Sequence, residues 1–114
     1  MANAFLSETD TGIGTSPATV FTCPSATQTT IIGLSVAHIE TSQITVDVQL
    51  DASGRTSGAE DSVYLVKAAP IPVGGALVVI GGDQKVVMEP GDAIKVTSDT
   101  AASADVVLSH LDIT

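Results

Sequence analysis

Short apolar runs separated by turn residues make up positions 69–97, APIPVGGALVVIGGDQKVVMEPGDAIKVT. The runs Ala76–Ile80, Lys85–Met88 and Ile94–Thr97 are rich in valine and isoleucine, which favour strands. Between them, Gly-Gly and Pro-Gly pairs supply the backbone angles that tight turns need. The stretch therefore predicts consecutive antiparallel strands, and it contains no motif with obvious chemistry.

Similar strands are predicted on both sides of this stretch, at Ala18–Cys23, Gln43–Asp51, Ser62–Ala68 and Ala104–Ile113. Gln43–Asp51 has the clearest alternation, with Ile, Val, Val and Leu on one face and Thr, Asp, Gln and Asp on the other. This pattern is typical of a strand with one buried and one wet face. We therefore expect Val46 and Ile94 in the core.

The segment Thr27–Ile39 differs from the others because it is apolar or small on both faces. Ile32, Leu34 and Val36 alternate with isoleucine, glycine, serine and alanine. This predicts a central strand that is covered on both sides.

The whole pattern predicts an all-β, single-domain antiparallel β-sandwich with about eight short strands, and no segment has the apolar spacing of an amphipathic helix. The Pro-Gly-Asp turn within Glu89–Ile94 resembles that of cupin-like jelly rolls, which implies jelly-roll-like geometry. We expect the sandwich domain at residues 17–114 and an N-terminal arm at residues 1–16. Phe5 and Leu6 are apolar points by which this arm could anchor on a neighbouring subunit.

Composition points toward self-association. Apolar residues make up 44% of the chain and charged residues only 15%, so much of the surface is expected to lie against other chains. A monomer with a neutral surface rich in serine and threonine would have a similar composition, and that alternative stays open.

The net charge is −9, with 13 acids against four bases, which argues against a nucleic-acid surface. No apolar run reaches the length of a membrane span, and the N-terminus lacks the features of a signal peptide, so we expect a chain made and kept in a cytoplasm. The loop Ala52–Glu60 contains the only arginine, Arg55. It is either a contact with another component or a tolerated insertion.

A search for chemistry predicts no enzyme, cofactor or metal site. His38 and His110 lack metal-ligand spacing, and a lone histidine on an apolar strand is expected to be packed. Cys23 is alone and is expected to be a small buried residue. The acidic turns lack the ligand spacing of a calcium loop.

From Thr29 onward the sequence resembles short structural proteins of tailed bacteriophages, including those of cyanobacteria. The resemblance runs through TTIIGLS (29–35), ITVDV (44–48), YLVK (64–67), APIPVG (69–74), VIGGDQK (79–85), GDAIKVTSD (91–99) and LDIT (111–114). It implies a virion component with an all-β fold that forms an oligomer.

This resemblance implies a capsid decoration, or cement, protein that binds the major capsid protein and forms a homotrimer. The alternative is a structural or receptor-binding module of the neck, tail or fibre. Either would be located in the virion and assembled in the host cytoplasm. The candidate partner contacts are Phe5, Leu6 and Arg55.

Overall fold

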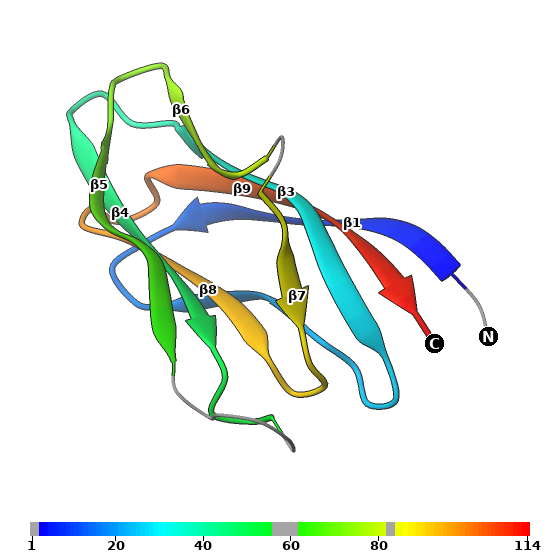
Figure 1. The fold of residues 1–114 in the computed structure, drawn as a ribbon. Coiled ribbons are helices and arrows are strands. Elements are labelled where there is room, and N and C mark those ends of the chain that lie inside the picture. The colour runs from blue at the N-terminus through cyan, green and yellow to red at the C-terminus, as the bar shows by residue number, and fades with distance from the viewer. Residues whose placement is uncertain (1–2, 56–61, 82–83) are drawn as a thin grey trace.

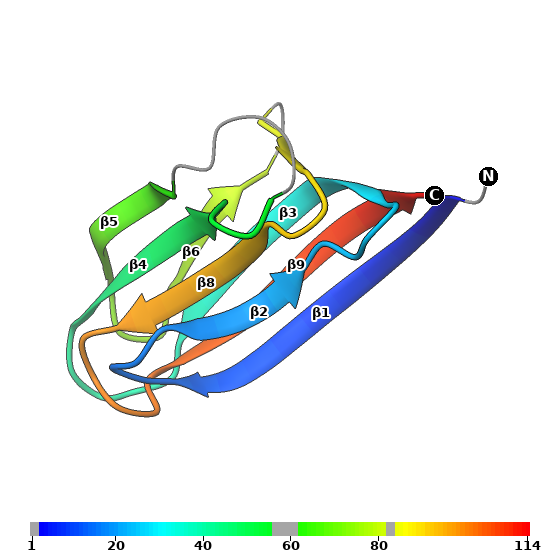
Figure 2. The ribbon, with the colours of Figure 1, turned by 90° about the horizontal axis from the view of Figure 1, so that it is seen from below.

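The computed structural model describes residues 3–55, 62–81 and 84–114, which form two antiparallel sheets packed face to face (Figures 1 and 2). The strands are β1 (Asn3–Ile13), β2 (Ala18–Thr22), β3 (Gln28–His38), β4 (Ile44–Asp51), β5 (Val63–Ile71), β6 (Ala76–Ile80), β7 (Val86–Met88), β8 (Ala93–Ser98) and β9 (Ala104–Ile113).

The first sheet has the order β1-β9-β3-β6, with β7 also paired to β3, and the second has the order β2-β8-β4-β5. The domain is elongated, with extents of 45 × 25 × 23 Å. Both termini lie at one end, where Asn3 pairs with Ile113 (Figure 1). In Figure 2, β1 and β2 lie side by side along one border of the sandwich.

The predicted all-β sandwich is confirmed, with nine strands instead of about eight. Each predicted strand is present with ends shifted by no more than a few residues. The additional strand is β1, formed by Asn3–Ile13. The division into an arm at 1–16 and a domain at 17–114 stays a prediction. The predicted loop at 52–60 and the turn at 81–83 lie partly outside the described residues.

The core lies between the sheets and is built from aliphatic side chains. Val46 and Ile94 are 1% and 0% exposed, so both expected core positions are confirmed. The same buried cluster contains the alternate residues of β9, including Val106 and Leu108. Burial of such side chains is the main contribution to the stability of the sandwich.

The predicted register of β3 is wrong in its first half. The pairing of β3 with β9 shifts between Ile31 and Gly33, which is a bulge. The bulge places Ile31, 0% exposed, on the same buried face as Leu34. An extra residue in one strand reverses the alternation, and the sequence pattern does not show where it falls.

The predicted position of β3 is correct, but its predicted covering is not. The strand lies between β9 on one side and β6 and β7 on the other. Its buried face packs on the second sheet, while Ser35 and Ala37 on the other face are only half-buried. Among the described residues no second layer covers this outer face.

The turn that joins β7 to β8 requires a glycine. Gly91 has φ of +94°, and the N–H of Asp92 donates to the carbonyl of Glu89 at 3.0 Å. A Cβ at Gly91 would lie 2.2 Å from the carbonyl oxygen of Gly54. The turn therefore packs on the loop after β4 so closely that only glycine fits.

Truncation of Ile94 tests the core. We expect Ile94→Ala to lower the free energy of unfolding by about 2–5 kcal/mol, because a fully buried side chain leaves a cavity. Thr97→Ala, on the opposite face of the same strand, should cost much less. The measurement is chemical denaturation of both variants, and equal losses would contradict the assigned faces of β8.

Candidate self-association surface

Strand β1 forms one border of the first sheet. It pairs with β9 without interruption from Asn3 to Asp10, and the register shifts only between Asp10 and Ile13. Because β1 ends the strand order, its other edge has no strand partner within the part of the chain that the structure describes. Such an edge presents a row of backbone N–H and C=O groups to other chains.

The other borders of the two sheets are short or protected. β2 and β6 have five residues each, and β7 has three. β5 contains Lys67 and Pro70 and pairs with β4 through two register shifts. Lysine, proline and bulges are the features by which natural sheets prevent edge pairing. β1 has eleven residues with neither lysine nor proline, so it is the border best suited to strand addition.

A buried polar cluster holds β1 in place from inside. His110 of β9 is fully buried, and its Nε2 lies 3.0 Å from Oε2 of Glu8 on β1. Its Nδ1 lies 2.7 Å from Oδ1 of Asp112, which also accepts a hydrogen bond of 2.8 Å from Thr29 of β3. The cluster therefore connects β1, β9 and β3.

Residues in and next to the second sheet cover this cluster. The ring of Phe21, on β2, lies 4.1 Å from the His110 ring between centroids. Cys23, which follows β2, has its sulfur 3.4 Å from the Thr29 hydroxyl and is 2% exposed. Burial raises the pKa of the Cys23 thiol, which makes it a poor nucleophile. The expectation of a small buried cysteine is confirmed.

Glu8 provides a test of this anchoring. We expect Glu8→Ala to accelerate amide hydrogen exchange in β1 by roughly two- to fivefold, the effect of losing a partly exposed side-chain hydrogen bond. Asp10→Ala is the matched control, because the Asp10 carboxylate accepts from the backbone N–H of Thr11 in its own strand. Equal acceleration in both variants would show that the His110 contact does not hold β1.

The outer face of the first sheet carries apolar and small side chains in rows across the strands. One row pairs Phe5 with Leu111, Leu111 with Thr30, and Thr30 with Val87. A second row joins four further residues in the same way. Its members are Thr9, Val107, Ser35 and Val78.

Four of these side chains are large, apolar and exposed. Phe5 is 77% exposed, Val78 67%, Val87 58% and Val107 44%. Between the rows, Ser109 pairs with Ser7 on one side and Gly33 on the other. We call this surface the outer face; it is defined by the two rows and the residues between them.

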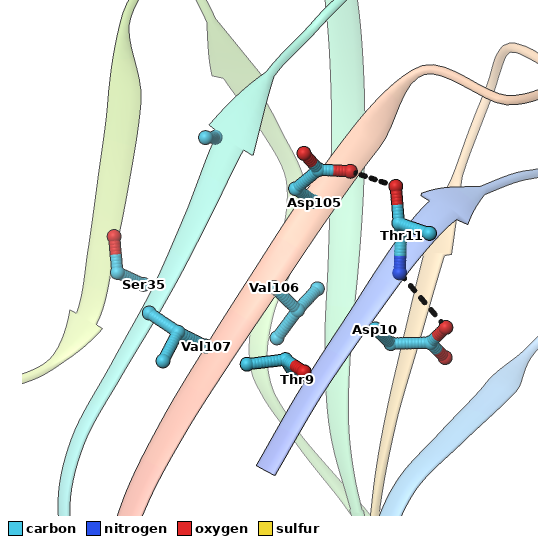
Figure 3. Close-up of a pocket in the computed structure, with 8 residues that line it drawn as sticks. Thr9, Asp10, Thr11, Ser35, Asp105, Val106 and Val107 are labelled. Carbon is cyan, nitrogen blue, oxygen red and sulfur yellow. Dashed lines mark hydrogen bonds between the residues drawn. The ribbon is translucent and has the colours of Figure 1, made fainter. Parts of the chain in front are cut away.

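A hollow of about 460 Å³ lies at one end of the outer face, where Thr9, Ser35 and Val107 line it (Figure 3). Asp105 also lines it and accepts a hydrogen bond from the Thr11 hydroxyl. Asp105, which pairs with Ala37 just beyond the second row, is the one charged residue at the paired positions on this side of the first sheet among the described residues. The outer face is therefore nearly neutral on a chain of net charge −9.

The opposite surface, on the second sheet, is polar and ion-paired. Lys95 lies 2.7 Å from Asp51, and Lys67 lies 3.5 Å from Asp47. The hydrogen bond from Lys95, with others from Ser53 and Ser62, holds the pKa of Asp51 well below its usual range. This surface matches the wet face predicted from the alternation of β4.

The Lys95–Asp51 pair predicts a specific acid sensitivity. Because its pKa is lowered by folding, Asp51 stabilises the fold above the ordinary aspartate value of about 4, and this contribution is lost as the pH falls further. We therefore expect Lys95→Met to lower the melting temperature near neutral pH, with a difference from wild type that shrinks as the solution is acidified.

Lys67→Met is the control, since the Lys67–Asp47 pair is longer and more exposed. Its difference from wild type should be smaller at every pH. Differential scanning calorimetry between about pH 7 and pH 2 measures both. A Lys95→Met effect that does not vary with pH would contradict the assignment.

Arg55 lies at an end of the sandwich, close to Asp92, which is fully buried. Its Nε donates to Oδ1 of Asp92 at 2.9 Å and its Nη2 to Oδ2 at 2.5 Å. This hydrogen bonding raises the pKa of Arg55 and neutralises the buried carboxylate. Arg55 thus holds the loop after β4 on the β7–β8 turn, and its role as a partner contact stays a prediction.

The other predicted contacts, Phe5 and Leu6, lie on β1 with side chains on opposite faces. Phe5 belongs to the outer face, and Leu6, 47% exposed, pairs with His110 on the inner side. The structure does not bring either residue near Arg55, which lies in the loop that follows the second sheet's β4. Both remain predicted partner contacts.

The described residues contain no cluster of three or more His, Cys, Asp or Glu side chains suited to a metal ion. They also contain no helix long and apolar enough to cross a membrane. His38 is the last residue of β3 and packs against the turn that follows, where its Nε2 donates to the Ser42 carbonyl at 2.7 Å and its Nδ1 accepts from the Glu40 N–H at 3.0 Å.

Comparison with known proteins gives one informative similarity. No protein-family model matches the sequence, and no curated protein matches it either. Among solved structures, a subunit from Bacillus endospore appendages, described as forming a novel family of disulfide-linked pili, has the same fold with a TM-score of 0.54. The identity is 11%, and the alignment covers 99% of this chain and 87% of that one.

This similarity corrects the functional expectations drawn from the sequence. The resemblance to tailed-phage virion proteins is wrong, because the structural match over almost the whole chain is to a subunit of spore pili. The assignments as a capsid decoration protein and as a neck, tail or fibre module depend on that resemblance, as does the location in a virion. They are overturned with it, and what remains is the fold of a structural pilus protein.

Sequence reasoning missed the features of β1 and of the outer face. Glu8, His110 and Asp112 are far apart in sequence, and nothing in their spacing indicates that they meet. Val78 and Val87 belong to predicted strands, but their common face depends on β6 and β7 both pairing with β3. The one signal that could have indicated this surface is the apolar character of Thr27–Ile39 on both faces.

Proposed function

We propose that this chain is a non-enzymatic structural subunit that assembles with copies of itself through the free edge of β1. The observation that carries the proposal is the edge of β1, which is regular from Asn3 to Asp10 and lies beside borders that are short, bulged or contain proline. A second copy of β1 would satisfy its backbone groups by strand addition.

Antiparallel pairing of two β1 strands around Ser7 fits their side chains. In this register Leu6 lies opposite Glu8 of the second copy, and Ala4 lies opposite Asp10. Each acid therefore meets a neutral residue, which avoids the cost of placing like charges opposite each other. The two first sheets would then form one continuous sheet across a two-fold axis.

The same register adds an apolar contact on the outer face. Phe5 of one copy lies opposite Thr9 of the other, beside the hollow that Thr9 and Val107 line. The 77% exposed ring of Phe5 would lose water contact there, which favours association. Phe5 and Leu6, the predicted contacts of the N-terminal segment, thus both lie at the proposed junction.

The endospore appendage subunit supports self-association, because that protein forms pili. Its pili are described as disulfide-linked, whereas this chain has one cysteine and buries it. We therefore assign the association to backbone pairing and apolar contact. The homotrimer expected from the sequence depended on a capsid lattice, and the edge of β1 favours two-fold pairing instead.

Proline substitutions in β1 test the proposal. The N–H groups of neighbouring residues in a strand point to opposite edges. Of the two variants Leu6→Pro and Ser7→Pro, one therefore removes a hydrogen bond to β9, and the other removes a donor from the free edge. We expect the variant that loses the bond to β9 to have a lower melting temperature. The variant that loses the free donor should keep a near wild-type melting temperature but form assemblies of lower mass in analytical ultracentrifugation.

A cysteine at the proposed axis gives an independent measurement. Opposed residues of antiparallel strands have Cα atoms about 4.5–5.5 Å apart, within the range of a disulfide. Ser7→Cys should therefore form a covalent dimer on mild oxidation, while Thr97→Cys, on the second sheet, should not. A thermally stable proline variant that assembles like wild type, together with an uncrosslinked Ser7→Cys, would reject the edge of β1 as the interface.

A further inference from the structure

The outer face of the first sheet has the character of an interface rather than of a solvent-facing surface. Four large apolar side chains, Phe5, Val78, Val87 and Val107, are exposed on it, separated by serine, glycine, threonine and alanine. The second sheet presents the opposite character, with lysine–aspartate pairs. A sandwich that only faced water would have polar residues on both outer faces.

The charge distribution favours a second copy of this chain as the partner that binds the outer face. Each copy carries a net charge of −9, so two copies repel over most of their surfaces. Three of the four bases, Arg55, Lys67 and Lys95, are held by aspartates of the same chain. The outer face has only Asp105 among its paired residues, so it is the surface on which two copies meet with least repulsion.

From these observations we infer that the outer face packs against the outer face of a second copy, which gives the chain a second self-association interface distinct from the edge of β1. Two sheets would stack about 10 Å apart, with the small residues Gly33, Ser35 and Ser109 receiving the valines of the opposite copy. An isologous contact places a patch against itself, and with the two-fold axis along the inner strand β9, Val107 of one copy faces Val107 of the other.

This inference depends on the proposed self-association but, apart from Phe5, involves different atoms. The edge contact uses the backbone of β1, whereas the face contact uses side chains of β9, β3, β6 and β7. The two surfaces are continuous because Phe5 lies in the border strand and in the first row of the outer face. With two separate interfaces, assembly can continue beyond a dimer, while either interface alone gives a closed pair.

Opposite charges at Val107 test the face directly. Val107 is exposed, so Val107→Lys and Val107→Glu should fold with near wild-type melting temperatures. Each variant alone should lose the face contact, because like charges would meet where Val107 of one copy faces Val107 of the other. An equimolar mixture of the two should recover association by at least tenfold over either one alone, because lysine then faces glutamate. Thr97→Lys mixed with Thr97→Glu, on the second sheet, is the matched control.

The edge and face contacts are separated by combining variants in analytical ultracentrifugation. Wild type should form assemblies larger than dimers, Val107→Lys should stop at the edge dimer, and the edge-blocking β1 proline should stop at the face dimer. The double variant should be monomeric. If Val107→Lys has the mass of wild type, or if the mixture recovers nothing, the face contact is rejected, even where Ser7→Cys crosslinking upholds the edge. If the outer face binds a different protein instead, Val107→Lys should also have the mass of wild type, and the inference would be rejected.

Discussion

The structure depends on β9 being paired on both sides within the first sheet. β1 and β3 pair with its two edges along nearly its full length. Its side chains therefore point alternately into the core and out to the surface. Val106, Leu108 and His110 point into the sandwich and are buried. Asp105, Val107 and Ser109 point outward into the rows of the outer face. A shift of one residue in either pairing would exchange the two sets, so the core and the candidate interface are determined by the same register.

The distribution of charge separates the molecule into two kinds of surface. Among the described residues, most acids lie in turns, on the second sheet or in the polar cluster around His110, while Asp10 and Asp105 lie on strands of the first sheet. The bases of the second sheet and of the loop after β4 pair with some of them. In the proposed assembly, electrostatic repulsion between copies opposes most approaches, and the nearly neutral outer face of the first sheet is the approach that it opposes least. Association of this kind depends on apolar burial and backbone hydrogen bonds, which salt screens little.

The similarity to the endospore appendage subunit shows how far a fold can indicate a function. The two chains share the sandwich at 11% identity, which establishes the arrangement of strands and not the contacts between subunits. The linkage by disulfides described for those pili has no exposed thiol to support it here, since Cys23 is buried between Thr29 and the turn after β2. In the proposed assembly, the shared architecture is joined through backbone pairing and apolar contact instead.

The sequence by itself determined the strands, their turns and most of the core. Alternation in 43–51 identified the buried face of that strand, because a period of two assigns each side chain to a face, and Pro90-Gly91 predicted a turn, at which the structure then showed that only glycine fits. It also indicated that Thr27–Ile39 has two apolar faces. Only the tertiary structure decided that 3–13 is a strand, because its sequence pattern is weak and the segment is held as a border strand by pairing with β9. The tertiary structure also decided three further features. These are the bulge at Ile32, the contact of Glu8 with His110, and the common face of Phe5, Val107 and Val78. Each of these depends on register between strands that are distant in the chain, which local sequence patterns do not encode.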